Sequence, residues 1–276
     1  MNITGIIKDA FLFPSKNIKR FAIYSLLSVL MVGFAFVGII IYALGLLDAQ
    51  NYLFGGIFLI ISMLVGFIIY GYHIKVIKSG IEHDDNVPAF KWYETFMTGF
   101  DNAIVSLVYF IIPALIVAVV WYDTNVFGNA VAIGHEFVSQ MISVYKMNTS
   151  INLAITAISN TVINFVISLA ITVTVALIVF VIFSILQIMA EARLANTGSL
   201  REALDIWGAV KDLTRIGIGK VILVLILILV ITAIIEIVFT MIVLQYLVLA
   251  ILYIILLPYL ALFAKRALGL LYSDIV

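Results

Sequence analysis

Long apolar stretches alternate with short polar segments along the whole chain. Six of these stretches are long enough to cross about 30 Å of hydrocarbon as a helix, which takes about 20 residues. They cover residues 21–46, 54–78, 102–122, 160–188, 219–240 and 243–264. The pattern predicts an all-α, polytopic integral membrane protein with six transmembrane helices in a single transmembrane domain, residues 1–276.

The last two apolar stretches run together without a glycine or proline between them. No basic residue interrupts the 44 positions between Lys220 and Lys265. One helix of that length would measure about 66 Å, twice the thickness of the hydrocarbon core. We therefore expect a helical hairpin that turns within Phe239–Tyr246.

The composition supports a membrane location. Hydrophobic residues make up 65% of the chain and charged residues 11%, whereas soluble domains have roughly 45–50% and about 25%. The formal net charge is zero, which argues against a nucleic-acid partner. The chain has no cysteine, which excludes disulfides, thiol catalysis and thiolate metal sites.

The basic residues predict how the chain is threaded. With the N-terminus inside and six spans, every lysine and arginine except Lys146 falls on the inner side. Cytoplasmic segments carry an excess of such residues. The expected protein is a multi-pass protein of the plasma membrane with both termini in the cytoplasm.

The segment 123–159 is then an extracytoplasmic loop. Within it one face of a helix on or in the outer leaflet could consist of Val126, Phe137, Met141, Val144 and Tyr145. The tripeptide that begins at Asn148 is an N-glycosylation acceptor sequence on the predicted outer side.

The inner segments resemble one another and suggest three repeated helical hairpins. A basic residue precedes a glycine by five positions at Lys75 and Gly80 and again at Arg193 and Gly198, with a looser counterpart before Gly269. A glycine suits the end of a helix, and cations favour that end. After each glycine we expect a short amphipathic interfacial helix that leads into the next span.

Three parts of the chain also carry a family resemblance. They are Ala10–Lys16, the stretch from Gly71 through Pro88, Trp92 and Gly99 to Pro113, and Ala192–Ala203. In these parts the chain resembles the polytopic prokaryotic membrane proteins grouped as domain of unknown function 4013, which are frequent in archaea. The resemblance implies a six-helix membrane domain and implies no activity. Trp92 lies four residues after Pro88, further than the family pattern has it, and the segment 123–159 is an elaboration.

Glu236 is the most informative single residue. It is a carboxylate flanked on both sides by apolar span, and ionisable groups at membrane depth tend to be functional. It could carry protons in a transporter, or it could lie near the outer end of its span and reach water or Gln245. The polar row Asn160, Asn164, Ser168 and Thr172 follows one face of span four, where it could line a polar cavity or bond neighbouring helices.

Other residues have a structural interpretation as well as a functional one. Gly33 and Gly38 suggest close helix contacts, and Pro113 and Pro258 suggest kinks. His73 and His83, with the acids near them, could bind a metal or serve an enzyme of lipid headgroups, but their spacing fits no fixed ligand geometry and favours a solvated turn. No ATPase, hydrolase, metalloprotease or EF-hand motif occurs.

The function expected from these features is that of an uncharacterised membrane protein. We expect no catalytic residues, resident metal or cofactor, and a protein that binds or moves a hydrophobic or lipid-like molecule or scaffolds partners. The expected partners are membrane lipids, other membrane proteins or further copies of the chain. The alternatives are a proton-coupled secondary transporter that uses Glu236 and a membrane enzyme that acts on lipid headgroups.

Overall fold

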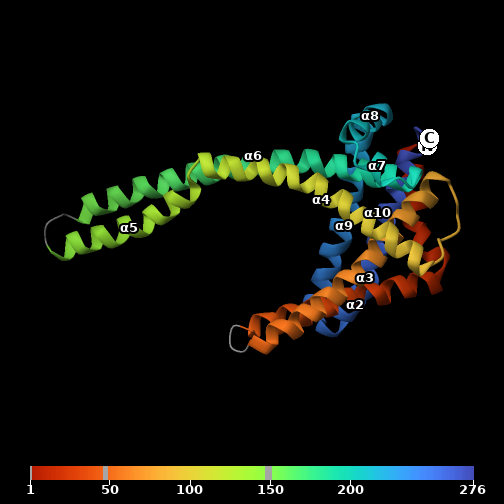
Figure 1. Ribbon diagram of the computed structural model, residues 1–276, viewed down its shortest axis with the longest axis horizontal. Coiled ribbons are helices and arrows are strands. Elements are labelled where there is room, and N and C mark those ends of the chain that lie inside the picture. The colour runs from red at the N-terminus through yellow and green to blue at the C-terminus, as the bar shows by residue number, and fades with distance from the viewer. Residues whose placement is uncertain (1, 46–48, 147–150) are drawn as a thin grey trace. The chain divides into compact units, whose positions relative to one another are not determined.

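The structure is a computed structural model that describes residues 2–45, 49–146 and 151–276, and these residues form helices and no strands (Figure 1). The elements in chain order are α1 (Ile3–Leu12), η1 (Phe13–Lys16), α2 (Ile18–Leu44), α3 (Ala49–Ile81), α4 (Trp92–Asp123), α5 (Val126–Tyr145), α6 (Ile151–Thr197), α7 (Leu200–Ala203), α8 (Ile206–Ile216), α9 (Ile218–Gln245), η2 (Leu247–Leu252) and α10 (Tyr253–Tyr272). Among the residues described, six helical stretches are long and apolar enough to cross a membrane. The predicted all-α polytopic membrane protein is confirmed.

The chain divides into two compact units. Unit 1 comprises Met1–Ser106 and Leu186–Val276, and unit 2 comprises Leu107–Ile185. Helices α4 and α6 each contribute to both units. We describe each unit by itself.

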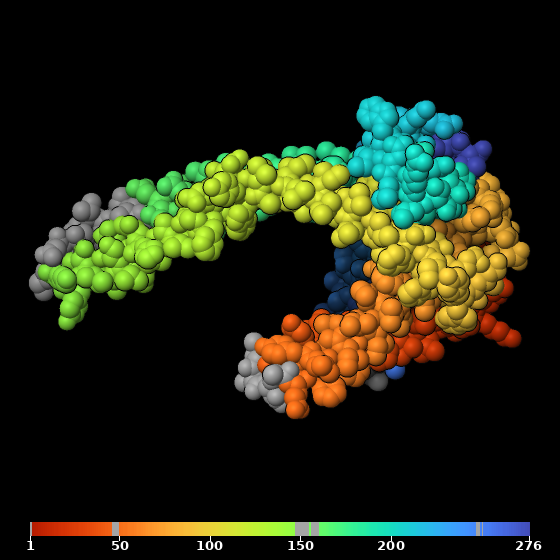
Figure 2. Space-filling model, in the orientation of Figure 1, coloured from red at the N-terminus to blue at the C-terminus, as the bar shows by residue number. Residues whose placement is uncertain are grey.

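Helix α10 is the central helix of unit 1. More than half of its most apolar window, 56%, is buried, against at most 22% for the other five candidate spans. Helices α2 and α3 pack side by side and form one continuous surface in Figure 2, and α10 packs on both. Because the other spans leave most of their apolar side chains exposed, lipid is the surrounding that satisfies them.

Aromatic residues form a stacked row inside unit 1. The Tyr24 and Tyr72 rings stack with centroids 5.4 Å apart, and Tyr72 stacks on Phe90 at 4.2 Å. Trp92 continues the row at 5.5 Å from Phe90. The Tyr72 hydroxyl donates a hydrogen bond to the Pro88 carbonyl at 3.1 Å, which holds the segment before α4 against α3.

Glycines let the helices of unit 1 approach each other closely. A Cβ on Gly71 of α3 would lie 1.7 Å from the Thr95 carbonyl oxygen of α4, and a Cβ on Gly99 would lie 1.6 Å from the Phe67 carbonyl oxygen. A Cβ on Gly269 of α10 would lie 2.1 Å from the Ile77 carbonyl oxygen of α3. No side chain fits at these crossings, so backbone packs on backbone.

Helix α3 ends one residue after Gly80, as expected, but Gly80 and Gly269 do not cap a helix, since both are helical residues. A Cβ on Gly80 would lie 2.9 Å from the Gly269 Cα, so each serves the α3–α10 crossing. Gly198, in contrast, does end a helix as expected, because it has φ +66° just after α6. There Ser199 caps α7, its hydroxyl accepting from the Glu202 amide at 3.4 Å.

The other predicted features of the spans have mixed outcomes. A Cβ on Gly38 would lie 2.9 Å from the Leu59 side chain, as a close contact requires, but Gly33 has nothing within 4 Å and does not pack.

Pro113 and Pro258 both lie inside continuous helices. The chain turns after Gln245, where α9 ends and η2 follows.

Unit 2 is a helical hairpin. The end of α4 continues into α5 after a break at Thr124–Asn125, where Asn125 has φ 50°, and α6 runs alongside (Figure 1). Most of the segment predicted as a loop, 123–159, is therefore helical among its described residues. With 47 residues, α6 is about 70 Å long, more than twice the hydrocarbon core, so part of it must lie outside that core or along its surface.

The glycine crossing yields a test of the fold. The substitution Gly71→Ala should destabilise the protein by at least about 3 kcal/mol, because a methyl group cannot share the space of a backbone carbonyl. The matched control is Gly56→Ala in the same helix, where nothing lies within 4 Å. Thermal unfolding followed by circular dichroism in detergent measures both. Equal melting temperatures for the two variants would contradict the close α3–α4 crossing.

Candidate functional site

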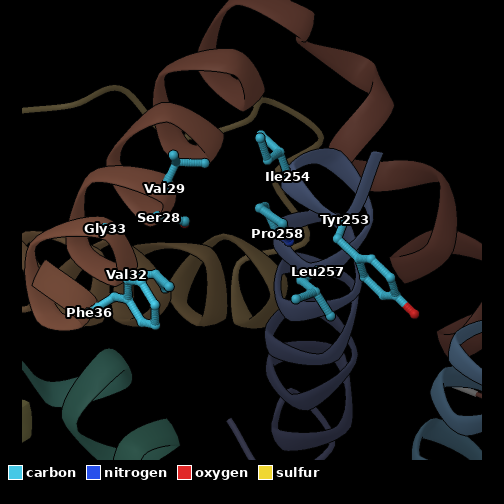
Figure 3. Close-up of a pocket in the computed structure, with 9 residues that line it drawn as sticks. All are labelled: Ser28, Val29, Val32, Gly33, Phe36, Tyr253, Ile254, Leu257 and Pro258. Atoms are coloured by element: carbon cyan, nitrogen blue, oxygen red, sulfur yellow. The ribbon is translucent and has the colours of Figure 1, made fainter. Parts of the chain in front are cut away.

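An apolar groove lies between α2 and α10 in unit 1. Its cavity has a volume of about 410 Å³. The α2 wall consists of Ser28, Val29, Val32, Gly33 and Phe36, and the α10 wall of Tyr253, Ile254, Leu257 and Pro258 (Figure 3). In Figure 3 the side chains of Val29, Ile254 and Pro258 occupy the space between the two helices.

The polar atoms of this groove are already engaged. The Ser28 hydroxyl donates to the Tyr24 carbonyl of its own helix at 2.9 Å. The Tyr253 hydroxyl lies 2.5 Å from the Thr240 hydroxyl of α9, and its ring packs edge-on against Phe239 at 4.8 Å. The groove therefore offers contact area without hydrogen bonds, which suits an apolar ligand.

Missing side-chain bulk keeps the groove open. Gly33 leaves the middle of the α2 wall bare, and a Cβ built there meets nothing within 4 Å. Toward the other end of α10 the two helices close up, where Tyr259 packs edge-on against Phe21 and Leu262 joins the core around Tyr24. The groove is thus a local separation of two helices that pack tightly further along.

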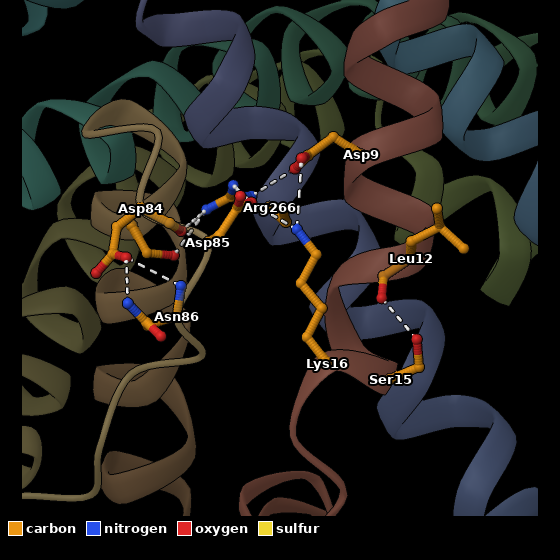
Figure 4. A network of polar contacts seen from close by, with 9 residues as sticks. Asp9, Leu12, Ser15, Lys16, Asp84, Asp85, Asn86 and Arg266 are labelled. Carbon is orange, nitrogen blue, oxygen red and sulfur yellow. Dashed lines mark hydrogen bonds and ion pairs between the residues drawn. The ribbon is translucent and has the colours of Figure 1, made fainter.

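A buried arginine organises the charged end of unit 1 (Figure 4). Arg266 of α10 is 1% exposed. Its Nε donates to Asp9 Oδ1 at 2.9 Å, and its Nη1 donates to the Asp84 carbonyl at 2.7 Å and to the Ser79 hydroxyl at 3.2 Å. The guanidinium lies 4.4 Å from the centroid of the Phe13 ring, which gives a cation–π contact.

Lys16 and Asp85 extend this network to the protein surface. Lys16 Nζ lies 2.5 Å from Asp85 Oδ1 and 3.6 Å from Asp9 Oδ2. The hydrogen bond and positive charge of Lys16 hold the pKa of Asp85 below its ordinary value of 3.8. The ionised Asp85 carboxylate therefore stabilises the folded protein at pH values above 3.8. This contribution is lost as the pH falls through the lowered pKa of Asp85.

Further ion pairs join the remaining segments at the same end. Lys265 bonds Glu191, and Arg193 Nη1 lies 3.0 Å from Asp212 Oδ2. The Tyr272 hydroxyl donates to the same Asp212 oxygen at 2.6 Å. These contacts tie the ends of α6, α8 and α10 together.

The burial of Arg266 was not predicted from the sequence. There Lys265 and Arg266 count only among the basic residues on the predicted inner side. The signal that could have revealed it is the apolar run Ala267–Tyr272 that follows, since it continues the helix beyond the arginine and is almost entirely buried.

The structure does not bring all predicted site residues together. Glu236 has an exposed side chain on α9 and does not line the groove, and Asn160 is exposed on α6. Asn148 lies outside the described residues. The transport role of these residues and the glycosylation of Asn148 stay predictions.

Asn164, Ser168 and Thr172 lie at a polar cluster in unit 2. Asn129 Nδ2 donates to the Ser168 hydroxyl at 3.2 Å, and the Thr124 and Thr172 hydroxyls lie 3.0 Å apart. These bonds hold the α4–α5 break against α6. A pocket of about 290 Å³ adjoins them, lined by Thr124, Asn129, Asn164, Ile167, Ser168 and Ile171. Ser168 and Thr172 are buried, whereas Asn164 is exposed.

His73 and His83 occupy different surroundings. His73 is buried in α3, with its Nε2 2.6 Å from the Tyr24 hydroxyl. His83 is exposed just after α3, with φ 52°. Within the described ranges, no three histidine, aspartate or glutamate residues gather as metal ligands.

The comparison with protein families identifies the family of this chain. The family described as "Protein of unknown function (DUF4013)" matches residues 54–244. The chain belongs to this family. Neither a curated protein nor a solved structure matches this DUF4013 protein. The matched range ends before α10 and begins after α2, so the walls of the groove and Arg266 lie outside it.

The arginine network yields a second prediction. The substitution Arg266→Met should destabilise the protein by about 3–5 kcal/mol, because Asp9 loses its hydrogen-bonded cation and the Asp84 carbonyl loses the Arg266 donor. The matched control is Arg201→Met, since Arg201 is exposed on α7. Chemical unfolding in detergent measures both. An Arg266→Met variant as stable as the control would show that the network does not hold α10.

Proposed function

We propose that this DUF4013 protein binds the hydrocarbon chain of a lipid in the groove between α2 and α10, without catalysing a reaction. The observation that carries the proposal is the groove itself, about 410 Å³ between two candidate membrane spans with an almost wholly apolar lining. The volume lies within the range of about 300–1,000 Å³ common for ligand pockets.

The shape of the groove favours a chain over a compact molecule. Its α2 wall runs from Ser28 to Phe36, which corresponds to about 12 Å along the helix axis. Both walls are helices of the bundle, so the groove opens toward the hydrocarbon layer and not toward water. In that layer the available apolar molecules are lipid chains, and the lining offers no free polar atom for a headgroup.

The two alternative functions have less support. A proton-coupled transporter would need Glu236 beside a polar cavity, and Glu236 belongs to the lining of neither the groove nor the polar pocket of unit 2. A headgroup enzyme would need the inner histidines and acids to converge, and His73 is instead buried against Tyr24.

We further propose that both termini face the cytoplasm, with the protein in the plasma membrane. In support, contacts such as Lys16–Asp85, Arg266–Asp9 and Lys265–Glu191 join segments that carry nearly all the basic residues. An excess of basic residues marks cytoplasmic segments. Membrane lipids are the proposed partners. Other membrane proteins and further copies of the chain are the remaining candidates.

The absence of cysteine makes the orientation testable with single-cysteine variants. A membrane-impermeant maleimide added to intact cells should label Lys146→Cys and should label Lys91→Cys only after lysis. Both positions have exposed side chains. Labelling of Lys91→Cys in intact cells would reverse the proposed orientation.

The groove is tested with a palmitate probe that carries a photoreactive diazirine on its chain. In the reconstituted protein the probe should crosslink to peptides that contain Val29–Phe36 and Ile254–Leu257. The substitution Gly33→Leu should reduce this crosslinking about tenfold, because the new side chain displaces two or more methylene groups worth about 0.8 kcal/mol each.

The matched control for the groove is Gly56→Leu, which adds the same side chain to an equally open position on α3 that does not line the groove. Its crosslinking should equal that of the unmodified protein. Crosslinks spread evenly over all spans and insensitive to Gly33→Leu would refute chain binding in the groove.

A further inference from the structure

Helix α8 stands directly before a membrane span. It ends at Ile216, and Gly217, with φ +99°, turns the chain into α9 at Ile218. Because α9 is a candidate span, α8 lies where that span meets the membrane surface. Short amphipathic helices in such positions lie in the interface plane.

One face of α8 is fixed to unit 1. Gly208, Ala209, Asp212 and Ile216 are buried. Asp212 receives bonds from Arg193 and from the Tyr272 hydroxyl, at 3.0 and 2.6 Å. A Cβ on Gly208 would lie 2.5 Å from Arg193 Nη1, so the helix packs directly on the arginine. This anchoring holds the opposite face outward.

The outward face combines an aromatic residue with two cations. Trp207, Lys211, Thr214 and Arg215 are exposed at helical spacing, and we call them the α8 basic face. Trp207 is 78% exposed. No carboxylate residue falls among them: Asp205 is exposed but precedes the helix, and Asp212 is buried.

The cations of this face differ from the paired cations of unit 1. Lys16, Lys75, Lys265 and Arg266 each have a carboxylate partner within 4.0 Å. Among the described residues, neither Lys211 nor Arg215 has one. Arg215 borders a polar pocket that Glu202 and Asp212 also line, but neither carboxylate forms an ion pair with it, so the positive charges of Lys211 and Arg215 are available to an external anion.

We propose that the α8 basic face binds the phosphate headgroups of anionic phospholipids in the leaflet where α9 begins. The guanidinium of Arg215 and the ammonium of Lys211 complement phosphate charge, and Trp207 suits the headgroup level of a bilayer. This site is separate from the groove, which takes a chain irrespective of headgroup. Failure of one proposal leaves the other standing.

The test uses the fluorescence of Trp207. In a full-length variant with Trp92→Phe and Trp121→Phe, Trp207 is the remaining tryptophan of the three. This variant is reconstituted in phosphatidylcholine nanodiscs that contain a trace of headgroup-spin-labelled phosphatidylglycerol or phosphatidylcholine. Labelled phosphatidylglycerol should quench Trp207 more strongly. Replacing Lys211→Gln and Arg215→Gln should reduce that preference about fivefold per cation removed.

Two matched variants complete the test. Lys8→Gln with Lys19→Gln removes the same charge from exposed positions elsewhere, and Lys211→Arg with Arg215→Lys keeps the charge of the face. Both should retain the preference. Equal quenching by the two lipids, or a preference that survives loss of both cations, would overturn the proposal. So would binding of a soluble polyglutamate peptide to this face without any lipid preference, which would assign the face to an acidic protein.

Discussion

The buried guanidinium of Arg266 is the interaction on which the rest of unit 1 depends. A charge with 1% exposure is tolerated only when it is paired and hydrogen-bonded, and here the acceptors come from α1, α3 and the segment after α3. Because no one of these elements can move without leaving a buried charge unpaired, the network sets where α10 begins to pack. The Gly80–Gly269 crossing next to it then brings α3 and α10 into backbone contact.

The groove is a consequence of that one-sided anchoring. Helix α10 is tied at its charged end by Arg266 and Lys265, and Tyr259 and Leu262 still pack on the residues around Phe21 and Tyr24. From Pro258 back to Tyr253 the contacts with α2 give way to an open cavity, and Tyr253 turns to Thr240 and Phe239 of α9 instead. The same helix thus provides the rigid end of unit 1 and one wall of its apolar groove.

The apolar pattern predicted the spans because helix length and hydropathy are local properties. It could not predict which small residues mediate contacts. Gly80 and Gly33 are both glycines in apolar helices, yet Gly80 touches α10 and Gly33 faces an open groove, and this difference depends on where the partner helix lies. Burial of Arg266 is equally non-local, since Asp9, its partner, is more than 250 residues away in the chain. The candidate groove therefore had no signal in the sequence beyond the lack of bulk at Gly33.

A bilayer changes what a space between helices means. Among lipid chains, exposed apolar side chains cost nothing, so helices associate through small residues, hydrogen bonds and ion pairs. In unit 1 these lie at the Gly71–Gly99 and Gly80–Gly269 crossings and in the Arg266 network. The groove lies where such contacts are lacking. So apolar a space within the hydrocarbon layer is unfavourable for water, and its lining by side chains of α2 and α10 is what the proposed binding of a lipid chain rests on.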